Sequence, residues 1–319
     1  MNKKKTAIVF GVSGQDGAYL SDFLLKKRYK VIGTTRKKSL RNLYRLKKLG
    51  IINKITISKG EATDLKFCKK ILNSKVNEVY YLAGASSVTG SFENPENSLK
   101  SNALGILNIL NIVNNKYNKI KVFNAASGQF YGDSKKNFYN LKSKIEPQSP
   151  YGVAKAVGYW FTKIYRENYD IFCCSGILFN HESSLRSKEF VTKKIIDTAK
   201  EIKFNKKIKL QLGNINIYRD WGWAPEYVKA FWLMLQRKKP VDLILGTGKT
   251  HSIREFVEEV FRLQKISKRN LTTNVKKFKR ILDIKGYKAD IKLTKKKIKW
   301  YPKITFKQII SKMVKGELY

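Results

Sequence analysis

The fold of this chain is decided by residues Thr6–Gly17, which read TAIVFGVSGQDG. The first five of these residues are mostly apolar and predict a buried strand, and the residues from Asp16 onward have the periodicity of an amphipathic helix. Between them, Gly11, Gly14 and Gly17 allow a tight turn and a close approach of the backbone to a ligand. A strand, this glycine spacing and a helix are typical of a loop that binds the pyrophosphate of a dinucleotide at a helix N-terminus.

Short apolar runs alternate with helical patterns through the first 180 residues. This alternation predicts the α/β class, with a Rossmann-type doubly wound parallel sheet. The predicted strands are residues 7–10, 30–34, 54–58, 78–82, 121–125 and 171–178. The predicted helices are residues 16–27, 65–73, 98–115 and 151–169.

The end of the second predicted strand bears on the choice of cofactor. An NAD enzyme usually places an acidic residue here to hold the ribose hydroxyls. This chain instead reads Thr34-Thr35-Arg36-Lys37 and has no carboxylate in this stretch. A cationic cluster suits a 2′-phosphate, so the sequence favours NADP, with solvated surface cations as the alternative explanation.

The chain changes character after residue 179 and becomes polar, aromatic and irregular. This change predicts a smaller, mixed substrate-binding region at the carboxyl side of the sheet, where open α/β folds bind their ligands. We therefore expect an NADP-binding Rossmann domain over residues 1–179, to which residues 230–250 return. Residues 180–229 and 251–319 are expected to form the substrate-binding region.

The composition is strongly basic, with a formal net charge of +42. Such a charge can attract polyanions, but the lysines are spread through every segment and no nucleic-acid motif accompanies them. We attribute the charge to compositional drift and do not expect nucleic acid as a partner. No apolar run reaches the roughly 18 residues of a membrane helix, which predicts no membrane partner and a cytoplasmic protein. The three cysteines have no recognisable zinc spacing, so no metal is expected.

Tyr151 and Lys155 form the clearest catalytic pattern. Residues four apart share one face of a helix, so the phenol and the ammonium group can act together. A phenol has a pKa near 10 in water and needs a neighbouring positive charge to exchange protons with a hydroxyl near neutrality. This pair follows the fifth predicted strand of a chain that begins with a dinucleotide loop, which indicates proton exchange at a sugar hydroxyl beside a nicotinamide ring.

Further stretches give the chain a more specific resemblance. They are Ser91–Glu96, Ser149–Lys155, Gly176–Ser183, Phe190–Lys194 and Arg219–Gly222. Together with the glycine loop, they resemble the extended short-chain dehydrogenase/reductases and, more narrowly, the GDP-mannose 4,6-dehydratase family. The motifs Phe-Asn-His-Glu and Arg-Asp-Trp-Gly are the most diagnostic of the family. The matching segments span roughly residues 5–262.

The resemblance implies an NADP-dependent lyase that acts on GDP-mannose and forms a homodimer or homotetramer. It implies catalytic positions at Ser127, Gln129, Tyr151 and Lys155. The implied cofactor-binding residues are Gly11, Val12, Ser13, Gly14, Gln15, Asp16, Gly17, Arg36, Glu61, Ala62, Leu82, Ala83, Gly84, Ala85, Ser86, Lys155, His181 and Arg186. The implied substrate-binding residues are Ser91, Asn180, Lys193 and Arg219.

The chain departs from the family pattern at three places. Glu61-Ala62 stands where the family has Asp-Leu. Ala83–Ser86 stands where the family has Gly-Ala-Gln-Ser, which removes one side-chain amide near the cofactor. The family's Thr-Ser-Glu reads Ser127-Gly128-Gln129. Serine can replace threonine because either hydroxyl can bridge the sugar and the tyrosine, whereas an amide is chemically unlike a carboxylate.

Gln129 questions one step of the implied reaction. That reaction oxidises C4 of the sugar, removes the C5 proton as the C6 hydroxyl leaves as water, and returns hydride to C6. The family's glutamate takes the C5 proton, but a side-chain amide does not accept a proton near neutrality. Oxidation and reduction at C4 need no such carboxylate, so a C4 reductase or 4-epimerase is the alternative. For the dehydratase, a neighbouring acid such as Asp133 is a candidate to replace the missing base.

A further alternative, of a different class, is a non-catalytic protein that binds NADP or nucleic acid. Such a protein could exploit the positive charge of the chain. A binding module has no need of the trio Ser127, Tyr151 and Lys155, which this chain retains. The sequence therefore favours an enzyme.

Overall fold

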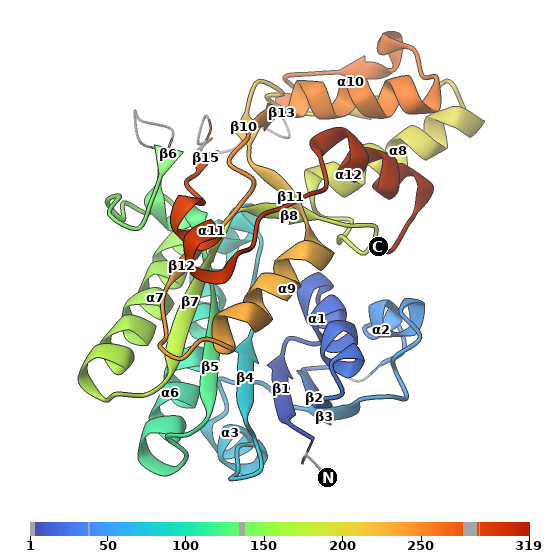
Figure 1. The fold of residues 1–319 in the computed structure, drawn as a ribbon. Helices are drawn as coiled ribbons and strands as arrows, with labels where there is room; N and C mark the ends of the chain where they lie inside the picture. Colours follow the sequence, from blue (N-terminus) through green and yellow to red (C-terminus); the bar gives the residue numbers. More distant parts are fainter. Residues whose placement is uncertain (1–3, 38, 134–137, 277–285, 287) are drawn as a thin grey trace.

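The computed structural model describes residues 4–37, 39–133, 138–276, 286 and 288–319. Its centre is a seven-stranded sheet with the strand order β12-β7-β5-β4-β1-β2-β3, and each neighbouring pair runs parallel (Figure 1). The predicted α/β class and Rossmann-type parallel sheet are confirmed. The strands of this sheet are β1 (Thr6–Phe10), β2 (Lys30–Thr35), β3 (Thr56–Lys59), β4 (Glu78–Tyr81), β5 (Lys121–Ser127), β7 (Cys173–Leu178) and β12 (Leu243–Leu245).

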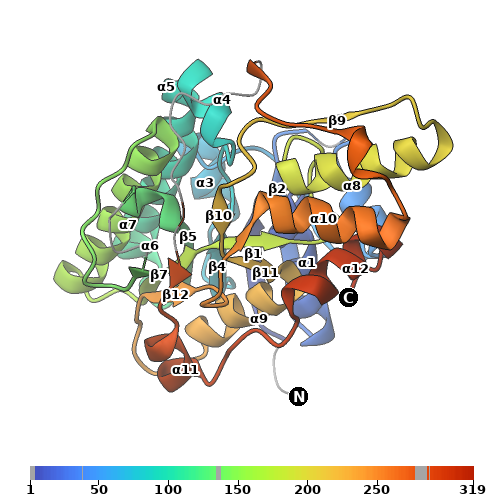
Figure 2. The same ribbon diagram turned by 90° about the horizontal axis from the view of Figure 1, so that it is seen from above.

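Helices cover both faces of the sheet (Figure 2). One face packs against α1 (Gln15–Lys26) and α9 (Ala224–Leu235), and the other packs against α3 (Leu65–Ile71), α6 (Gly105–Lys116) and α7 (Pro150–Asn168). Because both faces are covered, the central strands β1, β4 and β5 are buried along most of their length, rather than alternating between buried and exposed residues. No helix within the described residues is long and apolar enough to span a membrane.

A second layer lies above the carboxyl ends of the strands (Figure 1). It has its own apolar core, formed mainly by α8 (Val191–Phe204), α10 (Ile253–Gln264) and α12 (Phe306–Lys315). Residues 277–285 and 287 of the predicted substrate-binding region lie outside the described residues. Short strand pairs complete this layer and its edges: β8 (Asn180–Glu182) with β11 (Trp221–Trp223), β10 (Tyr218–Arg219) with β13 (His251–Ser252), β9 (Leu210–Gln211) with β14 (Leu271–Thr272), and β6 (Phe138–Tyr139) with β15 (Lys288–Ala289).

The predicted helix over residues 98–115 is divided. The chain forms α4 (Val88–Glu93), α5 (Pro95–Leu99), a π-helical turn over Lys100–Leu104, and then α6. The Asn102 amide group, within the π-turn, donates to the Ala85 carbonyl at 3.0 Å and to the Ser98 carbonyl at 2.9 Å. This side chain therefore ties the turn to the loop after β4, a contact that helical periodicity does not reveal.

Other boundaries differ by a few residues. The third strand begins at Thr56 rather than residue 54, because residues 52–55 form a turn in which the Lys54 amide donates to the Ile51 carbonyl at 2.9 Å. The helix that precedes β12 begins at Ala224, ahead of residue 230, and Pro225 occupies its first turn, where its missing N–H costs nothing. The remaining short elements are α2 (Tyr44–Lys48), α11 (Lys292–Ile298) and the 3₁₀ turns Gly128–Tyr131 and Lys268–Asn270.

Candidate active site

The glycine loop has the geometry of a ligand cradle. Gly11 has a φ of +86°, and a Cβ atom there would lie 2.9 Å from the Ala83 nitrogen. A Cβ atom on Gly17 would lie 2.2 Å from the Gly11 carbonyl oxygen. Both positions therefore exclude any larger side chain, and the turn delivers the N-terminus of α1 to the carboxyl edge of the sheet. The residues present fit a dinucleotide pyrophosphate.

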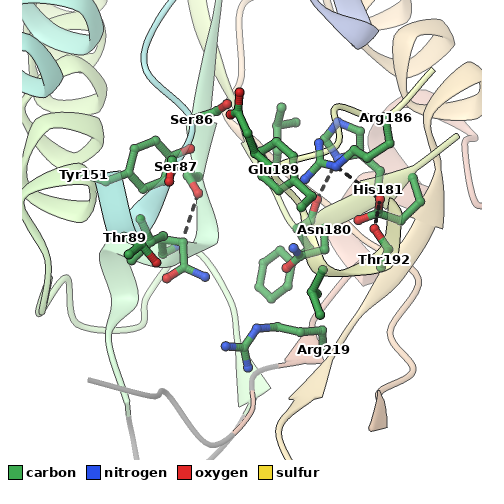
Figure 3. A pocket seen from close by; sticks show the side chains of 18 of the residues that line it. Ser86, Ser87, Thr89, Tyr151, Asn180, His181, Arg186, Glu189, Thr192 and Arg219 are labelled. Atoms are coloured by element: carbon green, nitrogen blue, oxygen red, sulfur yellow. Dashed lines mark hydrogen bonds and ion pairs between the residues drawn. The ribbon is translucent and has the colours of Figure 1, made fainter. Parts of the chain in front are cut away.

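A cavity of about 520 Å³ opens between this edge and the second layer (Figure 3). It has two walls. The catalytic wall comprises Ser127 at the end of β5, Gln129 in the following turn, and Tyr151 and Lys155 on α7. The anchoring wall comprises Asn180, His181, Glu182, Arg186 and Arg219, which come from β8, β10 and the loop after β8.

The catalytic wall holds its groups close to the start of α7. Ser149 caps this helix by accepting a hydrogen bond from the Gly152 amide, and Pro150 occupies its first turn. Tyr151 is thereby fixed in the first turn, and its side chain lines the cavity although the residue is only 9% exposed. Ser127 is also buried, and its hydroxyl accepts a hydrogen bond from the backbone N–H of Gln129 at 3.2 Å.

Lys155 lies one helical turn behind Tyr151. Its Nζ donates to the Ala125 carbonyl at 2.7 Å and lies 5.8 Å from the centre of the Tyr151 ring. Burial lowers the pKa of Lys155 to about 8, against an opposing influence of the Asp16 carboxylate. The ammonium group is thus close to the phenol and partly desolvated, which strengthens its effect on a phenolate.

The anchoring wall is joined to the glycine loop by a buried pair. His181 Nε2 lies 2.8 Å from Asp16 Oδ2, and His181 Nδ1 lies 2.8 Å from the Phe179 carbonyl oxygen. Burial disfavours a charged imidazole, but Asp16 and the Phe179 carbonyl outweigh this and raise the pKa of His181. Burial likewise opposes ionisation of Asp16, but His181 outweighs it and lowers the Asp16 pKa. With an oxygen near each ring nitrogen, the surroundings of His181 favour an imidazolium beside the Asp16 carboxylate.

A second ionic cluster lies beside the first. Arg186 Nε lies 3.1 Å from Glu182 Oε2, and the same carboxylate oxygen accepts from the Thr192 hydroxyl at 2.7 Å. The Arg186 guanidinium also stacks on the Phe190 ring, 3.5 Å from its centre. The Glu182 carboxylate is therefore paired with the charge of Arg186 and fixed by the Thr192 hydroxyl.

The carboxylates at the cavity have different surroundings. Asp16 and Glu182 take part in the two ionic clusters, whereas Glu189 is solvent-exposed. The Glu189 side chain extends from the loop before α8 toward Ser86 on the opposite side of the cavity (Figure 3). Asp133, the acid that sequence reasoning considered near Gln129, is exposed and does not line the cavity.

The structure brings many of the predicted site residues together. All four catalytic positions line the cavity, as do Asn180 and Arg219 of the substrate set. The cofactor set at the cavity comprises Asp16, Leu82, Gly84, Ala85, Ser86, Lys155, His181 and Arg186. The other cofactor candidates lie behind this lining in the glycine loop or at strand ends: Gly11, Val12, Ser13, Gly14, Gln15, Gly17, Arg36, Glu61, Ala62 and Ala83.

Two substrate candidates do not reach the cavity. The Ser91 hydroxyl is buried, donates to the Val88 carbonyl at 2.7 Å and accepts from the Tyr151 amide at 3.1 Å, so it supports the start of α7. Lys193 Nζ pairs with Asp197 at 2.6 Å. Lys194, the next residue on α8, lines the cavity instead. Which of these two adjacent lysines faces the cavity depends on where α8 begins, at Val191, because the starting residue decides which side of the helix each lysine occupies.

Sequence reasoning also missed polar groups around the loop after β4. Ser87, Thr89 and Asn102 line the cavity on the side of Tyr151, and Figure 3 places the first two beside it. Asn102 Oδ1 is buried without a hydrogen-bond partner, while a Cβ atom on Gly84 would lie 2.1 Å from it. The sequence does not single out Asn102, because the same helical stretch also carries other polar residues such as Asn108 and Asn111.

The Rossmann-type sheet, the glycine cradle and the Tyr151–Lys155 pair define a short-chain dehydrogenase/reductase of the extended class. Residues 8–313 match the family described as GDP-mannose 4,6 dehydratase. The Drosophila melanogaster GDP-mannose 4,6 dehydratase is 35% identical over 99% of this chain and 87% of its own length. This chain belongs to the GDP-mannose 4,6-dehydratase family.

Solved structures with lower identity share the fold. A dTDP-glucose 4,6-dehydratase from Bacillus anthracis, in complex with NAD, has a TM-score of 0.84 and 21% identity, covering 98% of this chain and 96% of that chain. A UDP-glucose 4-epimerase from Thermotoga maritima, in complex with UDP-glucose, has a TM-score of 0.86 and 19% identity, covering 98% of both chains. Since a dehydratase and an epimerase fit equally well, the fold does not distinguish these activities.

Proposed function

We propose that this protein is an NADP-dependent lyase that converts GDP-mannose to GDP-4-keto-6-deoxymannose, as the names of its relatives suggest. The observation that carries the proposal is the catalytic wall. It sets Ser127, Tyr151 and Lys155 around one cavity that adjoins a dinucleotide cradle. This arrangement suits the exchange of a proton and a hydride at one carbon of a bound sugar.

The proposal includes NADP rather than NAD. Gly11, Gly14 and Gly17 would receive the pyrophosphate at the N-terminus of α1. Arg36, exposed at the end of β2, would meet the 2′-phosphate. Bound there, NADP would supply the hydride chemistry at C4 and C6 of the sugar.

Tyr151 is the proposed base for the first proton. Its phenolate takes the C4 hydroxyl proton, and the buried Lys155 ammonium stabilises that phenolate. The Ser127 hydroxyl bridges the sugar oxygen and the tyrosine. Asn180 and Arg219 on the anchoring wall are the proposed contacts of the GDP-sugar, with the guanidinium facing phosphate.

Glu189 is the proposed acid/base of the elimination. Gln129 stands at the family's base position and cannot accept the C5 proton. Among the carboxylates that line the cavity, Asp16 and Glu182 are held in ionic clusters, whereas Glu189 is exposed and extends across the cavity. Its carboxylate would take the C5 proton and return it to the departing C6 hydroxyl, which leaves as water.

A second candidate function is favoured by Gln129 itself. Without a base for C5, the same catalytic wall still supports oxidation and reduction at C4, as in a C4 reductase or 4-epimerase. The two candidates differ in one product. A dehydratase releases a sugar with a C4 carbonyl and a C6 methyl group, whereas a C4 oxidoreductase leaves the C6 hydroxyl in place.

The test is incubation of the protein with GDP-mannose and NADP, with the products analysed by proton NMR and mass spectrometry. We expect a C6 methyl signal and the loss of one water from the sugar. An epimerised sugar of unchanged mass would favour the second candidate. Absence of any turnover, with correctly folded protein, would refute both.

The proposal also covers the division of the chain and its location. We assign residues 1–179, with 230–250, to NADP binding and residues 180–229 with 251–319 to substrate binding, since β12 pairs with β7 in the main sheet. We also assign the protein to the cytoplasm, where cell fractionation should recover it. Limited proteolysis with and without NADP checks the division, because bound cofactor should protect its own part selectively.

We further propose a homodimer, or a homotetramer built from it. Val153, Trp160 and Ile164 on α7 are exposed, and their spacing of seven and four residues places them on one helical face. Leu99 and Leu104, in the neighbouring α5 and π-turn, are exposed as well. An apolar stripe of this kind fits an interface between two copies. Trp160→Glu should shift the mass measured by light scattering to that of a monomer, whereas Lys163→Glu on the same helix should not.

A further inference from the structure

We infer that Arg45 is a positioning residue that couples dinucleotide binding to GDP-sugar binding. The inference rests on the proposed function, since it concerns the two ligands of that site. Arg45 lies on α2 and does not itself line the cavity. Its role would be to hold the glycine loop and the anchoring wall as one unit.

The guanidinium of Arg45 bridges two segments that are far apart in the sequence. Its Nη1 donates to the Ser13 carbonyl at 2.9 Å, inside the glycine loop. Its Nε donates to the Leu185 carbonyl at 2.7 Å, in the loop after β8. The planar guanidinium presents these donors in a fixed geometry, so the two carbonyls are held at a set separation.

Gln15 makes a parallel bridge between the same two segments. Its side-chain amide donates to the His181 carbonyl at 3.1 Å, and its oxygen accepts from the Ser183 hydroxyl at 2.8 Å. The Asp16–His181 pair adds a third connection. All three connections run from residues 13–16 to residues 181–185, which follow Asn180 and precede Arg186 on the cavity wall.

Arg45 is partly buried, and its two hydrogen bonds join the glycine loop to the loop after β8 through one rigid group. Partial burial also lowers the pKa of Arg45. A ligand that orders the glycine loop would therefore order residues 181–185 too. The second ligand would then bind to residues that are already ordered, so its binding would cost less conformational entropy. This is positive coupling between the two sites.

The experiment measures coupling directly by calorimetry. The ligands are NADPH and GDP-mannose, because the reduced cofactor cannot accept hydride and the ternary complex does not turn over. For the wild type, we expect GDP-mannose to tighten NADPH binding about tenfold. Arg45→Met and Arg45→Lys should both reduce this factor to below about twofold, since lysine keeps the charge but cannot span both carbonyls.

Two more variants make the test specific. Lys48→Met removes an exposed cation from the same short helix and should leave the coupling factor unchanged. Ser183→Ala removes one bond to Gln15 and should lower the factor to about threefold, which provides a reading even if Arg45→Met does not fold. Thermal melting of each variant separates a loss of coupling from a loss of stability.

The outcomes distinguish the two claims. Full coupling in Arg45→Lys would overturn the bridge, because only the charge would then matter. A wild type that binds both ligands independently would overturn the inference and leave the proposed function standing. A folded wild type that binds neither ligand would overturn both.

Discussion

The two walls of the cavity use ionisable groups in opposite ways. The anchoring wall places Glu182 and Arg186 in one ion pair and His181 in another, and the pair of His181 with Asp16 fastens this wall to the glycine loop. The catalytic wall carries a phenol, a hydroxyl and a buried ammonium group, and Gln129 stands where the resemblance to the family implies a carboxylate. We propose that the charges of the anchoring wall hold structure, whereas the groups of the catalytic wall transfer protons.

This difference bears on the elimination step of the proposed reaction. A carboxylate that is neutralised by an arginine or an imidazolium is a poor base, because its partners stabilise the ionised form. Proximity of acids to the cavity therefore does not replace the missing glutamate. Glu189, which is exposed at the edge of the anchoring wall, is the exception on which elimination depends in our account.

The largest effect is expected from Tyr151→Phe. Loss of the phenol removes the base for the C4 hydroxyl and should slow hydride transfer about 10²- to 10⁴-fold. The measurement is the appearance of reduced nicotinamide in a single turnover with GDP-mannose. Tyr169→Phe, at the exposed end of the same helix, is the matched control and should keep the wild-type rate. A Tyr151→Phe variant with a rate of nicotinamide reduction within threefold of the wild type would show that the catalytic wall does not provide the base.

A smaller and more selective effect is expected from Glu189→Gln. If Glu189 takes the C5 proton, deuterium incorporation at C5 from heavy water should fall about 10²-fold. The rate of nicotinamide reduction should remain within about twofold of the wild type. Lys188→Gln, the exposed neighbour, controls for a change in loop charge. Equal loss of both steps would assign Glu189 to substrate binding instead of proton transfer.

The ionic connection between the walls predicts a pH dependence of stability. The raised pKa of His181 means that its contribution is fully present below about pH 6.5 and is lost as pH rises through the raised value. The lowered pKa of Asp16 means that its contribution is lost only in acid, as pH falls through the lowered value. Asp16→Asn should cost about 3 kcal/mol in the free energy of unfolding at pH 6.

The difference between the wild type and Asp16→Asn should then shrink as the pH is raised toward 9. Urea unfolding at pH 5 to 9 measures it. Glu201→Gln, an exposed change of the same kind on α8, should show no such trend. A pH-independent difference would mean that His181 is neutral in the folded protein.

The fold was predictable because its determinants are local. Gly11 and Gly17 occupy positions where any Cβ atom collides with backbone, so the glycine loop can be recognised from the sequence alone. The Tyr151–Lys155 spacing is likewise a property of one helix. The glycine loop and the alternation of strand and helix patterns predicted the parallel sheet, and the helical spacing predicted the Tyr151–Lys155 pair. Ser127 and Gln129 on the catalytic wall came only from the resemblance to the family.

The anchoring wall was less predictable because its contacts are non-local. Asp16 and His181 lie 165 positions apart in the chain, and Arg45 reaches Leu185 across 140. Neither separation leaves a periodic signal. Lys194 lines the cavity and Lys193 does not because α8 begins at Val191, and Ser91 supports α7 from within the core. Such assignments need the phase and packing of each helix.

The central claim is that this family member retains C4 oxidation and is limited at the C5 proton transfer by Gln129. The most direct test is to compare the wild type with Gln129→Glu in heavy water, with GDP-mannose and NADP. We predict that Gln129→Glu raises formation of the 4-keto-6-deoxy product about 10²-fold, while nicotinamide reduction stays within about twofold. An unchanged rate of product formation in a folded variant would contradict the claim.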